Sequence, residues 1–227
     1  MLRYVIAGLI AFLFLAAFFY FFIRPYSYRW KPCYGFKAYG VCMPSGFQVH
    51  GIDVSHYQGN IDWKMLTQTR QGKFPIHFVF MKASEGGDYG DKAFITNFDS
   101  AKTHGFIRGA YHFYNPKTDP IRQADFFINS VKLDSGDLPP VLDIEKRGKD
   151  ENQLRRDLKL WLDKIEQHYK VKPILYTSYK FKTRYLNDSV FNSYPYWIAH
   201  YYVDSVEYRG RMEILAAYGC GYVAGHS

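Results

Sequence analysis

The sequence lacks the short motifs that identify several common classes of enzyme and binding protein. It has only three cysteines in 227 residues, and their spacing does not resemble a zinc site. It contains no glycine-rich GxGxxG segment and no Walker loop, which disfavours a dinucleotide- or nucleotide-binding fold. It has no dense run of Lys and Arg, so we expect no nucleic-acid partner. No metal and no cofactor is implied.

Disorder is excluded as well, because the composition can fill a hydrophobic core. Hydrophobic residues make up 48% of the chain, which includes 21 Tyr and 19 Phe. The length suits one sizeable domain or two small ones. So many Tyr and Trp residues also suit a groove that stacks on sugars, although packing in the core is the simpler explanation for any single aromatic side chain.

The formal net charge of +8 is partly a property of the N-terminal segment. The first 32 residues carry four basic residues and no acidic one, and the other residues comprise 25 basic and 21 acidic ones. This mild excess is compatible with an anionic substrate or a lipid surface.

A long uncharged run lies close to the N-terminus. Tyr4 to Ile23 is 20 residues without a charge, which is long enough to cross a bilayer. The run ends in FFYFFIRPY, where a cleavable signal peptide would have small residues. We therefore expect an uncleaved signal anchor over residues 1–24, with the lipid bilayer as the partner of residues 4–23. A linker over 25–46 and a domain over 47–227 follow.

The side of the membrane on which the domain lies is left open by the sequence. Arg3 precedes the run, whereas Arg24, Arg29 and Lys31 follow it, so the positive-inside rule places the domain in the cytoplasm. The function inferred below requires the extracytoplasmic, periplasmic side. A disulfide between cysteines 33 and 42 would indicate export, and two free thiols would fit a cytosolic linker.

Strand and helix patterns alternate along the domain. Strands are predicted at 50–55, 76–84, 106–114, 138–145, 172–178 and 194–201. Helices are predicted at 61–72, 91–105, 119–133 and 151–170. Asp62 is placed to start the first helix, Gly105 ends the second, and Asp119 followed by Pro120 begins the third.

This alternation predicts parallel βαβ units. The predicted strands end in polar or acidic residues, and in a β/α barrel the carboxyl ends of all strands meet at one face, where active sites lie. The expected fold class is α/β, an irregular TIM-like β/α barrel with fewer than eight helices, plus an N-terminal transmembrane helix.

The strand PPVLDIE carries two acids, Asp143 and Glu145, at positions that face the same side of a strand. Paired carboxylates in a cleft are the usual catalysts of glycoside hydrolysis. One of them must hold a proton for the leaving oxygen, and burial and a neighbouring negative charge raise its pKa. DIE alone is a weak signal, since an acid at a strand end is often a helix cap or a surface residue.

Five motifs in order are far more specific than that pair. The segments are GIDVSHYQGNIDW, FVFMKASEGGDYGDKAF, GAYHFYNP, PPVLDIE and ILYTS. In this order they resemble the glycoside hydrolase family 25 lysozymes, over about Val49 to Tyr201. The resemblance implies a shortened, irregular β/α barrel that cleaves the β-1,4 bond between N-acetylmuramic acid and N-acetylglucosamine. Its partners would be the glycan strands of peptidoglycan, and we expect a monomer.

The resemblance also implies roles for individual residues. Glu145 would be the general acid/base, Asp143 would orient the N-acetyl group of the substrate or act as nucleophile, and Asp53 would tune the pair, unless it is only a cap. No serine–histidine–acid order fits a nucleophile better. The residues expected to line the sugar groove are Glu85, Tyr111, His112, Tyr176, Trp197 and Tyr201. His112 fits a hydrogen-bonded structural histidine equally well, and His56 a plain loop residue.

The C-terminal segment departs from the family pattern from about residue 211. The family closes with a segment like WxFWQxTxxGxxxGI, whereas this chain ends RMEILAAYGCGYVAGHS. One choice of synonymous codons from Met212 onward, read one base later, gives WKFWQHTDVGTLPGI. We hypothesise a frameshift near Gly210 or Arg211, which would remove the last barrel strand and one site aspartate and make Cys220 accidental. The nucleotide sequence of the gene across this position tests it.

Two function hypotheses follow. A third, that the chain is a membrane-tethered protein that binds a partner, has little support beyond the N-terminal segment. The first is a membrane-anchored muramidase, an enzyme of the lysozyme type that acts in cell-wall catabolism or remodelling. The alternative is a non-catalytic peptidoglycan-binding barrel, inactivated by the altered C-terminus. The presence of Asp53, Asp143 and Glu145 favours the enzyme.

Overall fold

The computed structural model describes residues 1–24, 49–72, 75–199 and 214–217. It divides the chain into an N-terminal unit and a larger unit that contains the sheet, and each is described by itself. The linker predicted over 25–46 and its two cysteines lie outside the described residues, as do Tyr201 and Cys220.

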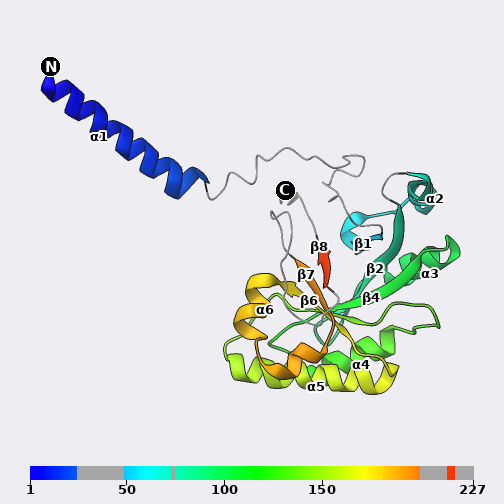
Figure 1. Ribbon diagram of the computed structural model, residues 1–227. Coiled ribbons are helices and arrows are strands. Elements are labelled where there is room, and N and C mark those ends of the chain that lie inside the picture. Colours follow the sequence, from blue (N-terminus) through cyan, green and yellow to red (C-terminus); the bar gives the residue numbers. More distant parts are fainter. Residues whose placement is uncertain (25–48, 73–74, 200–213, 218–227) are drawn as a thin grey trace. The chain divides into compact units, whose positions relative to one another are not determined.

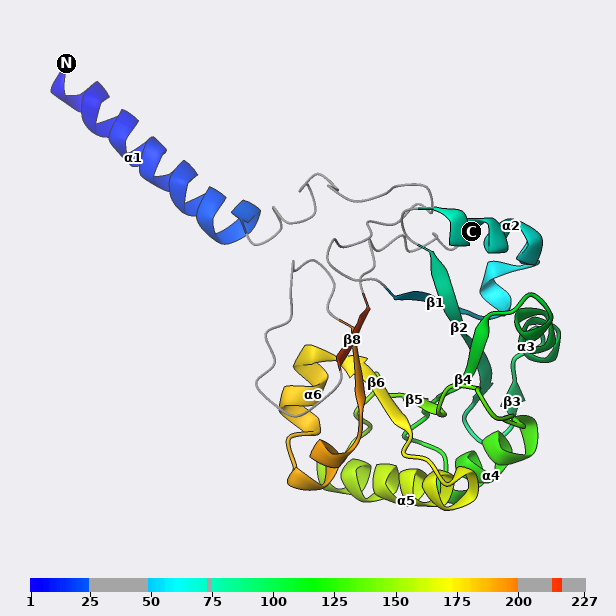
Figure 2. The same ribbon diagram turned by 45° about the vertical axis from the view of Figure 1, so that its right-hand side comes forward.

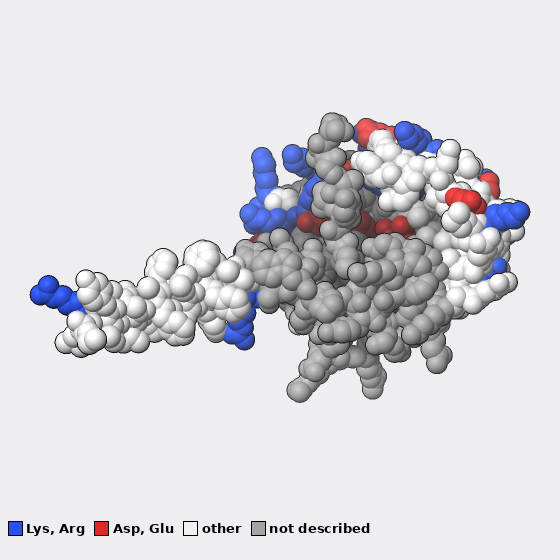
Figure 3. Space-filling view, turned by 90° about the horizontal axis from the view of Figure 1, so that it is seen from above, with Lys and Arg blue, Asp and Glu red and all other residues white. Residues whose placement is uncertain are grey.

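The described part of the N-terminal unit, residues 1–24, is mainly one apolar helix. α1 (Leu2–Phe18) continues into a π-helical turn, η1 (Phe19–Ile23). A window of 18 residues within this 22-residue stretch has a mean hydropathy of 2.6, and none of that window is buried. At 1.5 Å per residue the 22 residues span about 33 Å, close to the thickness of a bilayer's hydrocarbon core. Figure 3 shows that the surface of this helix has no acidic side chains and has basic ones only near its two ends.

The larger unit is a curled, mainly parallel sheet. The strands pair in the order β1 (His50–Val54), β2 (Ile76–Glu85), β4 (Ile107–Phe113), β5 (Val141–Asp143), β6 (Ile174–Ser178), β7 (Tyr196–Ala199) and β8 (Ile214–Ala217). A two-residue strand, β3 (Tyr89–Gly90), adds antiparallel to β2. Figure 2 shows the strands arranged in an arc with the helices outside it. The expected irregular α/β barrel is confirmed as a curled half-barrel.

The helices lie outside the sheet, in connections between its strands. They are η3 (His56–Gln58), α2 (Trp63–Gln68), η4 (Thr69–Gln71), α3 (Phe94–Thr103), α4 (Pro120–Ser130), α5 (Glu151–Tyr169), α6 (Tyr179–Tyr185) and η5 (Ser189–Ser193). α3, α4 and α5 each correspond to a predicted helix, and α2 and η4 together correspond to the helix predicted over 61–72. η3, α6 and η5 were not predicted, since they are short and carry little periodicity.

Local chemistry sets the helix ends as the sequence suggested. The carboxylate of Asp62 accepts a hydrogen bond from the Met65 backbone N–H (2.8 Å), and the carboxylate of Asp119 accepts one from the Arg122 N–H (2.8 Å). These bonds satisfy backbone donors that a first helical turn leaves unpaired. Gly105, with φ of 72°, directly follows the cap of α3, where an L side chain would be strained.

Two hydrophobic cores lie on opposite faces of the sheet. The large outer core contains the apolar stripe of α5, in which Leu154, Leu158, Leu162 and Ile165 recur every three or four residues. The small inner core has three buried members, Phe80, Val141 and Ile174, with Phe78, Tyr111, Leu138, Tyr176 and Trp197 packed against them. The inner core forms the floor beneath the carboxyl ends of the strands.

Two predicted features need correction. β5 is three residues long, so Glu145 lies just after the strand rather than within it. The C-terminal segment does supply a strand, because Ile214–Ala217 pairs in parallel with Tyr196–Ala199. A short apolar stretch can satisfy the free edge of β7 through backbone hydrogen bonds alone. Of the segment from residue 211 onward, only this strand is described.

Candidate active site

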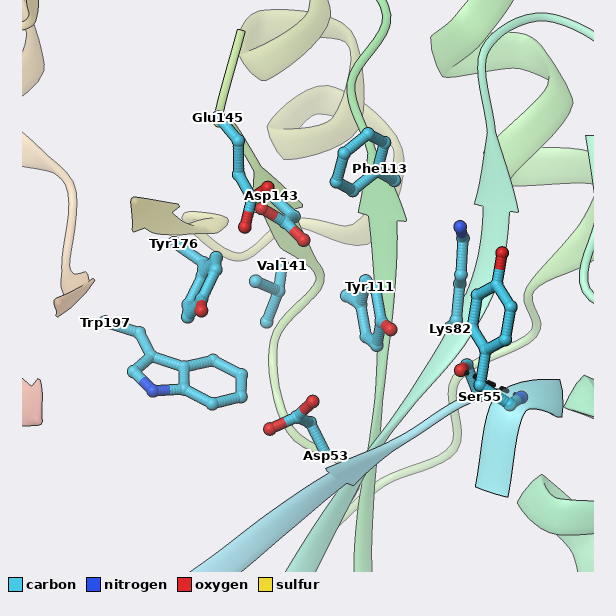
Figure 4. Close-up of a pocket in the computed structure, with 11 residues that line it drawn as sticks. Asp53, Ser55, Lys82, Tyr111, Phe113, Val141, Asp143, Glu145, Tyr176 and Trp197 are labelled. Carbon is cyan, nitrogen blue, oxygen red and sulfur yellow. Dashed lines mark hydrogen bonds between the residues drawn. The ribbon is translucent and has the colours of Figure 1, made fainter. Parts of the chain in front are cut away.

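Three carboxylates meet in a pocket at the carboxyl end of the sheet. Asp53 comes from β1, Asp143 ends β5, and Glu145 lies two residues further on. Figure 4 shows the Asp143 and Glu145 side chains next to each other, with Asp53 on the opposite side of the pocket. We call this cavity of about 250 Å³ the acid pocket.

Aromatic side chains make most of the remaining wall. Tyr111 and Phe113 come from β4, Tyr176 from β6 and Trp197 from β7. The ring centroids of Tyr176 and Trp197 are 4.8 Å apart at an interplanar angle of 72°, an edge-to-face contact that fixes both rings. Register explains the cluster, since Asp143 pairs with Phe113 on one side and with Tyr176 on the other.

Burial and mutual repulsion set the protonation of the acids. The pKa of Asp143 lies well above its usual range, first because the side chain is buried and second because Glu145 and Asp53 are negative. Its Oδ1 atom is buried and accepts no hydrogen bond from any described residue. A buried charge without a partner is costly, so Asp143 readily keeps a proton in the free pocket.

Glu145 and Asp53 are more open to solvent than Asp143. The walls around Glu145 remove part of its hydration and raise its pKa, and the positive charges of Lys146 and Lys82 oppose that rise. The pKa of Asp53 is also raised by loss of hydration, although the side chain keeps contact with solvent through the pocket. The three acids therefore differ in how easily each gives up its proton.

The phenol of Tyr111 lies within the field of these acids. Burial raises its pKa far above the usual tyrosine value, and the negative charges of Asp53 and Asp143 raise it further. A tyrosine in this setting stays neutral and can donate a hydrogen bond to an acceptor in the pocket.

Six of the nine predicted site residues line the acid pocket: Asp53, Tyr111, Asp143, Glu145, Tyr176 and Trp197. Glu85 lines a neighbouring pocket instead. Tyr201 lies outside the described residues.

His112 lies on the other face of β4 and has no exposed surface. Its Nε2 is 3.1 Å from Gln123 Oε1, and its Nδ1 is 2.8 Å from the Ser84 hydroxyl. Since Gln123 Oε1 only accepts, Nε2 carries the proton and Nδ1 accepts from Ser84. Burial lowers the pKa of His112 to about 4, so the ring is neutral. Its position fits the structural histidine and not a contact with a ligand.

The prediction missed five residues of the acid pocket: Ser55, Tyr57, Lys82, Phe113 and Val141. Three of them carried a signal. Phe113 and Val141 lie two positions from Tyr111 and Asp143 on the same strand face. Lys82 carried the strongest one, as a lysine inside the apolar run IHFVFMKAS. Its side chain is 9% exposed and its Nζ lies 2.6 Å from Glu85 Oε2. A buried lysine requires such a partner.

The sequence and the fold match one known family. Residues 52–218 match the sequence profile of Glycosyl hydrolases family 25. The chain belongs to this family. The match covers most of the chain and includes every residue of the acid pocket.

Individual relatives agree with family 25. The uncharacterized protein YegX of Escherichia coli K12 is 37% identical over 176 residues, which are 77% of this chain and 63% of that protein. Lysozyme M1 of Streptomyces globisporus is 33% identical over 175 residues, 69% of this chain and 56% of that protein. The chain thus spans less than two thirds of the length of these relatives.

Solved structures of family 25 have the same fold. The bacterial lysozyme from Streptomyces coelicolor superimposes with a TM-score of 0.68 at 29% sequence identity, covering 77% of this chain and 85% of that one. The family 25 glycosyl hydrolase from Bacillus anthracis superimposes with a TM-score of 0.64, also at 29% identity, covering 70% of this chain and 74% of that one.

Proposed function

We propose that this protein is a muramidase, a lysozyme that hydrolyses the β-1,4 bond between N-acetylmuramic acid and N-acetylglucosamine in peptidoglycan. The observation that carries the proposal is the meeting of Asp53, Asp143 and Glu145 in one aromatic-walled pocket of a family 25 fold. Acids supply the proton and the charge that glycoside hydrolysis needs, and aromatic rings suit the flat faces of sugars.

Glu145 is the proposed general acid. It is the more exposed of the two adjacent acids, so it can reach a glycosidic oxygen in the open part of the pocket. Loss of hydration raises its pKa and helps it to hold a proton at neutral pH. It would donate that proton to the oxygen of the departing N-acetylglucosamine as the C1–O bond breaks, and then accept a proton from the attacking water.

Asp143 is the proposed orienter of the substrate. Its buried Oδ1, which accepts no hydrogen bond from the described residues, would be a site for the N–H of the muramic N-acetyl group. That hydrogen bond would favour the charged carboxylate, so Asp143 would give up its proton when substrate binds, and its negative charge would help the adjacent Glu145 to hold one. The acetamido oxygen would then attack C1, and water would open the resulting ring. This neighbouring-group route is a recognised exception to the covalent scheme.

The proposed location is the extracytoplasmic side of a membrane. The helix from Leu2 to Ile23 is long and apolar enough to act as an anchor, and peptidoglycan lies outside the cytoplasm. Residues 1–24 would be the anchor, 25–46 the linker and 47–227 the catalytic barrel. Protease added to intact spheroplasts should digest the barrel, whereas protection until lysis would contradict this orientation.

Purified peptidoglycan tests the proposed activity. The full chain in detergent should release new reducing ends that are N-acetylmuramic acid, and Glu145→Gln should abolish this release. Glu151→Gln is the matched control, because this acid begins α5 outside the acid pocket and pairs with Arg147 and Arg155.

Two results would contradict the proposal. Reducing ends that are N-acetylglucosamine would indicate a different bond specificity. Binding of peptidoglycan by the parent protein without any release would support the non-catalytic barrel instead.

A further inference from the structure

A second cavity adjoins the acid pocket and plays no part in the chemistry proposed above. It has a volume of about 390 Å³ and shares two lining residues, Tyr57 and Lys82, with the acid pocket. In Figure 4 Lys82 lies on the side of the acid pocket away from Tyr176 and Trp197. We call this cavity the side pocket. Its size falls within the range of small-ligand sites, roughly 300–1,000 Å³.

The side pocket differs in chemistry from the acid pocket. Its lining is mainly polar and carries both signs of charge, with Lys82 and Glu85 from β2 and Asp88 from the turn after it. The Asp88 side chain is 80% exposed, and Arg122 Nη2 lies 3.5 Å from it. A surface of this kind suits a ligand with amide, carboxylate and amine groups better than a bare sugar ring.

Two tyrosines border the side pocket. Tyr57 is 80% exposed and Tyr89 is 43% exposed. Both rings lie near the imidazole of His56, with centroids 4.0 Å and 6.3 Å from it. Exposed tyrosines around a polar hollow offer flat faces that contact peptide planes with little loss of side-chain entropy.

The walls of the side pocket are held in place by partly buried hydrogen bonds. His56 Nδ1 lies 2.6 Å from Oδ2 of Asp91, and the backbone N–H of His56 donates to the same oxygen (3.1 Å). The Asp91 side chain has no exposed surface. Burial would raise the pKa of Asp91, but these bonds outweigh it and hold the pKa below the usual value. His56 is therefore fixed, and the loop beside it is preorganised.

The opposite wall is tied to the buried side chain of Gln123. Gln123 Oε1 accepts from the Asn115 backbone N–H (2.9 Å), and Gln123 Nε2 donates to the carbonyls of Asn115 (3.0 Å) and Thr118 (2.9 Å). The same Gln123 meets His112, so the buried network on the outer face of β4 sets the position of this loop. A pocket with two anchored walls can bind without first becoming ordered.

The inference about the ligand of the side pocket rests on the proposed function. The muramic residue of the proposed substrate carries a substituent that must lie close to the acid pocket. The muramic sugar carries a lactyl ether to which a short peptide is attached, so the peptide begins next to the ring whose bond is cleaved. We propose that the side pocket binds the peptide substituent of the muramic residue and gives the enzyme a preference for peptide-bearing glycan.

Each part of the side pocket matches a part of such a peptide. The Asp88 side chain, which is 80% exposed, would offer negative charge to an amine of the peptide. Lys82 and Glu85 form an ion pair of 2.6 Å, which would offer a donor and an acceptor to the polar groups of the peptide. The Asn115 side chain offers an amide for the peptide backbone. The acid pocket would select the sugar and the side pocket its substituent.

The test compares two forms of one substrate with the full chain in detergent. One form is purified peptidoglycan with its peptides, and the other is the same glycan stripped of peptides by an amidase. We expect kcat/KM to be about tenfold higher on the peptide-bearing form, the effect of one or two well-placed polar contacts. Equal values on both forms would overturn the proposal while leaving the muramidase intact. Cleavage of neither form would instead reject the proposed function.

Variants locate the effect in the side pocket. Tyr89→Ala and Asp88→Asn should each lower kcat/KM on peptide-bearing glycan several-fold and leave the rate on stripped glycan unchanged. Asp125→Asn is the matched control, an exposed acid of α4 paired with Lys164. Two outcomes would show that the side pocket does not bind the peptide. In one, both variants lose activity equally on the two substrate forms; in the other, they lose no activity on either form.

Discussion

Tyr111 and His112 are neighbours on β4, yet they lie in different surroundings. Tyr111 faces the acid pocket among Asp53, Asp143 and Glu145. His112 faces outward, is fully buried, and has its ring stacked on that of Trp161 at a centroid distance of 5.6 Å. The inner face of the sheet thus holds carboxylates that repel one another. The outer face holds His112, a buried polar side chain whose two ring nitrogens both meet hydrogen-bond partners.

This difference between the two faces has a consequence for mutations. Residues on the outer face should affect the free energy of unfolding and leave the rate unchanged. Carboxylates on the inner face should affect the rate and lower the stability of the native protein at neutral pH. Enzymes commonly retain such strained groups because activity requires them.

The largest expected effect is on the inner face. Asp143→Asn should lower kcat on peptidoglycan roughly 10²–10⁴-fold, the range of a lost acid–base or orienting group. The measurement is the initial rate of reducing-end release. Asp137→Asn is unsuitable as a control, because Asp137 pairs with the buried Arg108. Asp163→Asn, on the surface of α5, is suitable. An unchanged rate in Asp143→Asn would remove this residue from the mechanism.

The outer face should respond in stability. Leu158 is fully buried on α5, so Leu158→Ala should lower the free energy of unfolding by about 2–5 kcal/mol. Leu160, two positions along the same helix, is 48% exposed, and Leu160→Ala should stay within about 0.5 kcal/mol. Urea unfolding of both variants measures the difference. A similar loss in both would mean that α5 does not pack as described.

A substitution at Gly109 of β4 should change both the stability and the rate, because this residue packs against the floor of the acid pocket. A Cβ at this position would lie 2.3 Å from the Phe80 ring and 3.0 Å from Leu138 Cβ, so the floor of the acid pocket would have to move. Gly109→Ala should cost about 1–3 kcal/mol and also lower the rate, unlike Leu158→Ala. Gly90→Ala is the control, since its Cβ would meet only Phe126 at 3.9 Å. A Gly109→Ala protein with normal stability would contradict this packing.

The smallest expected effect is a dependence of stability on pH. The pKa of Asp143 is higher in the folded than in the unfolded chain, so folding favours its protonated form. Its contribution is fully present below the ordinary carboxyl pKa of about 4 and is lost as pH rises through the raised value. Asp143→Asn should therefore match the parent in Tm at low pH and exceed it at neutral pH.

Thermal unfolding of both proteins across pH measures this gap. Each kcal/mol corresponds to about 2–4 °C in a chain of this size. A gap that is largest at low pH and closes toward neutrality would have the wrong sign and would contradict a raised pKa for Asp143.

Much of the fold was predictable because its signals are local. Strand and helix periods, the caps at Asp62 and Asp119 and the glycine after α3 depend on residues within one turn of each other. Asp143 and Glu145 do lie next to each other (Figure 4), although Glu145 follows the end of β5, so strand alternation alone does not place it. The predicted extent of β5 was wrong: the strand was expected over 138–145 and is Val141–Asp143. The ends of a strand depend on hydrogen-bond partners from neighbouring strands, which the local sequence does not show.

The site was only partly predictable, since a strand pattern does not say which face will be the inside of the barrel. Tyr111 and His112 looked equally suitable in the sequence, and only the packing of α4 and α5 on one face assigned them different roles. Lys82 was the missed signal, a charge within an apolar strand. The side pocket was not predicted as a separate cavity, although Glu85 was predicted as a site residue, because its lining comes from segments about 60 residues apart, around His56 and Asn115.

The sequence by itself determined the alternation of strands and helices, the ends of several helices, the apolar N-terminal segment and the acids that the fold brings together. These follow from residue spacing and backbone hydrogen bonding over short distances. The tertiary structure decided which side of each strand faces the acid pocket, how deeply each acid is buried, and where a second pocket opens beside the first. Those properties depend on burial and on the charges of residues that are far apart in the chain. Burial and these charge interactions exist only once the sheet has curled.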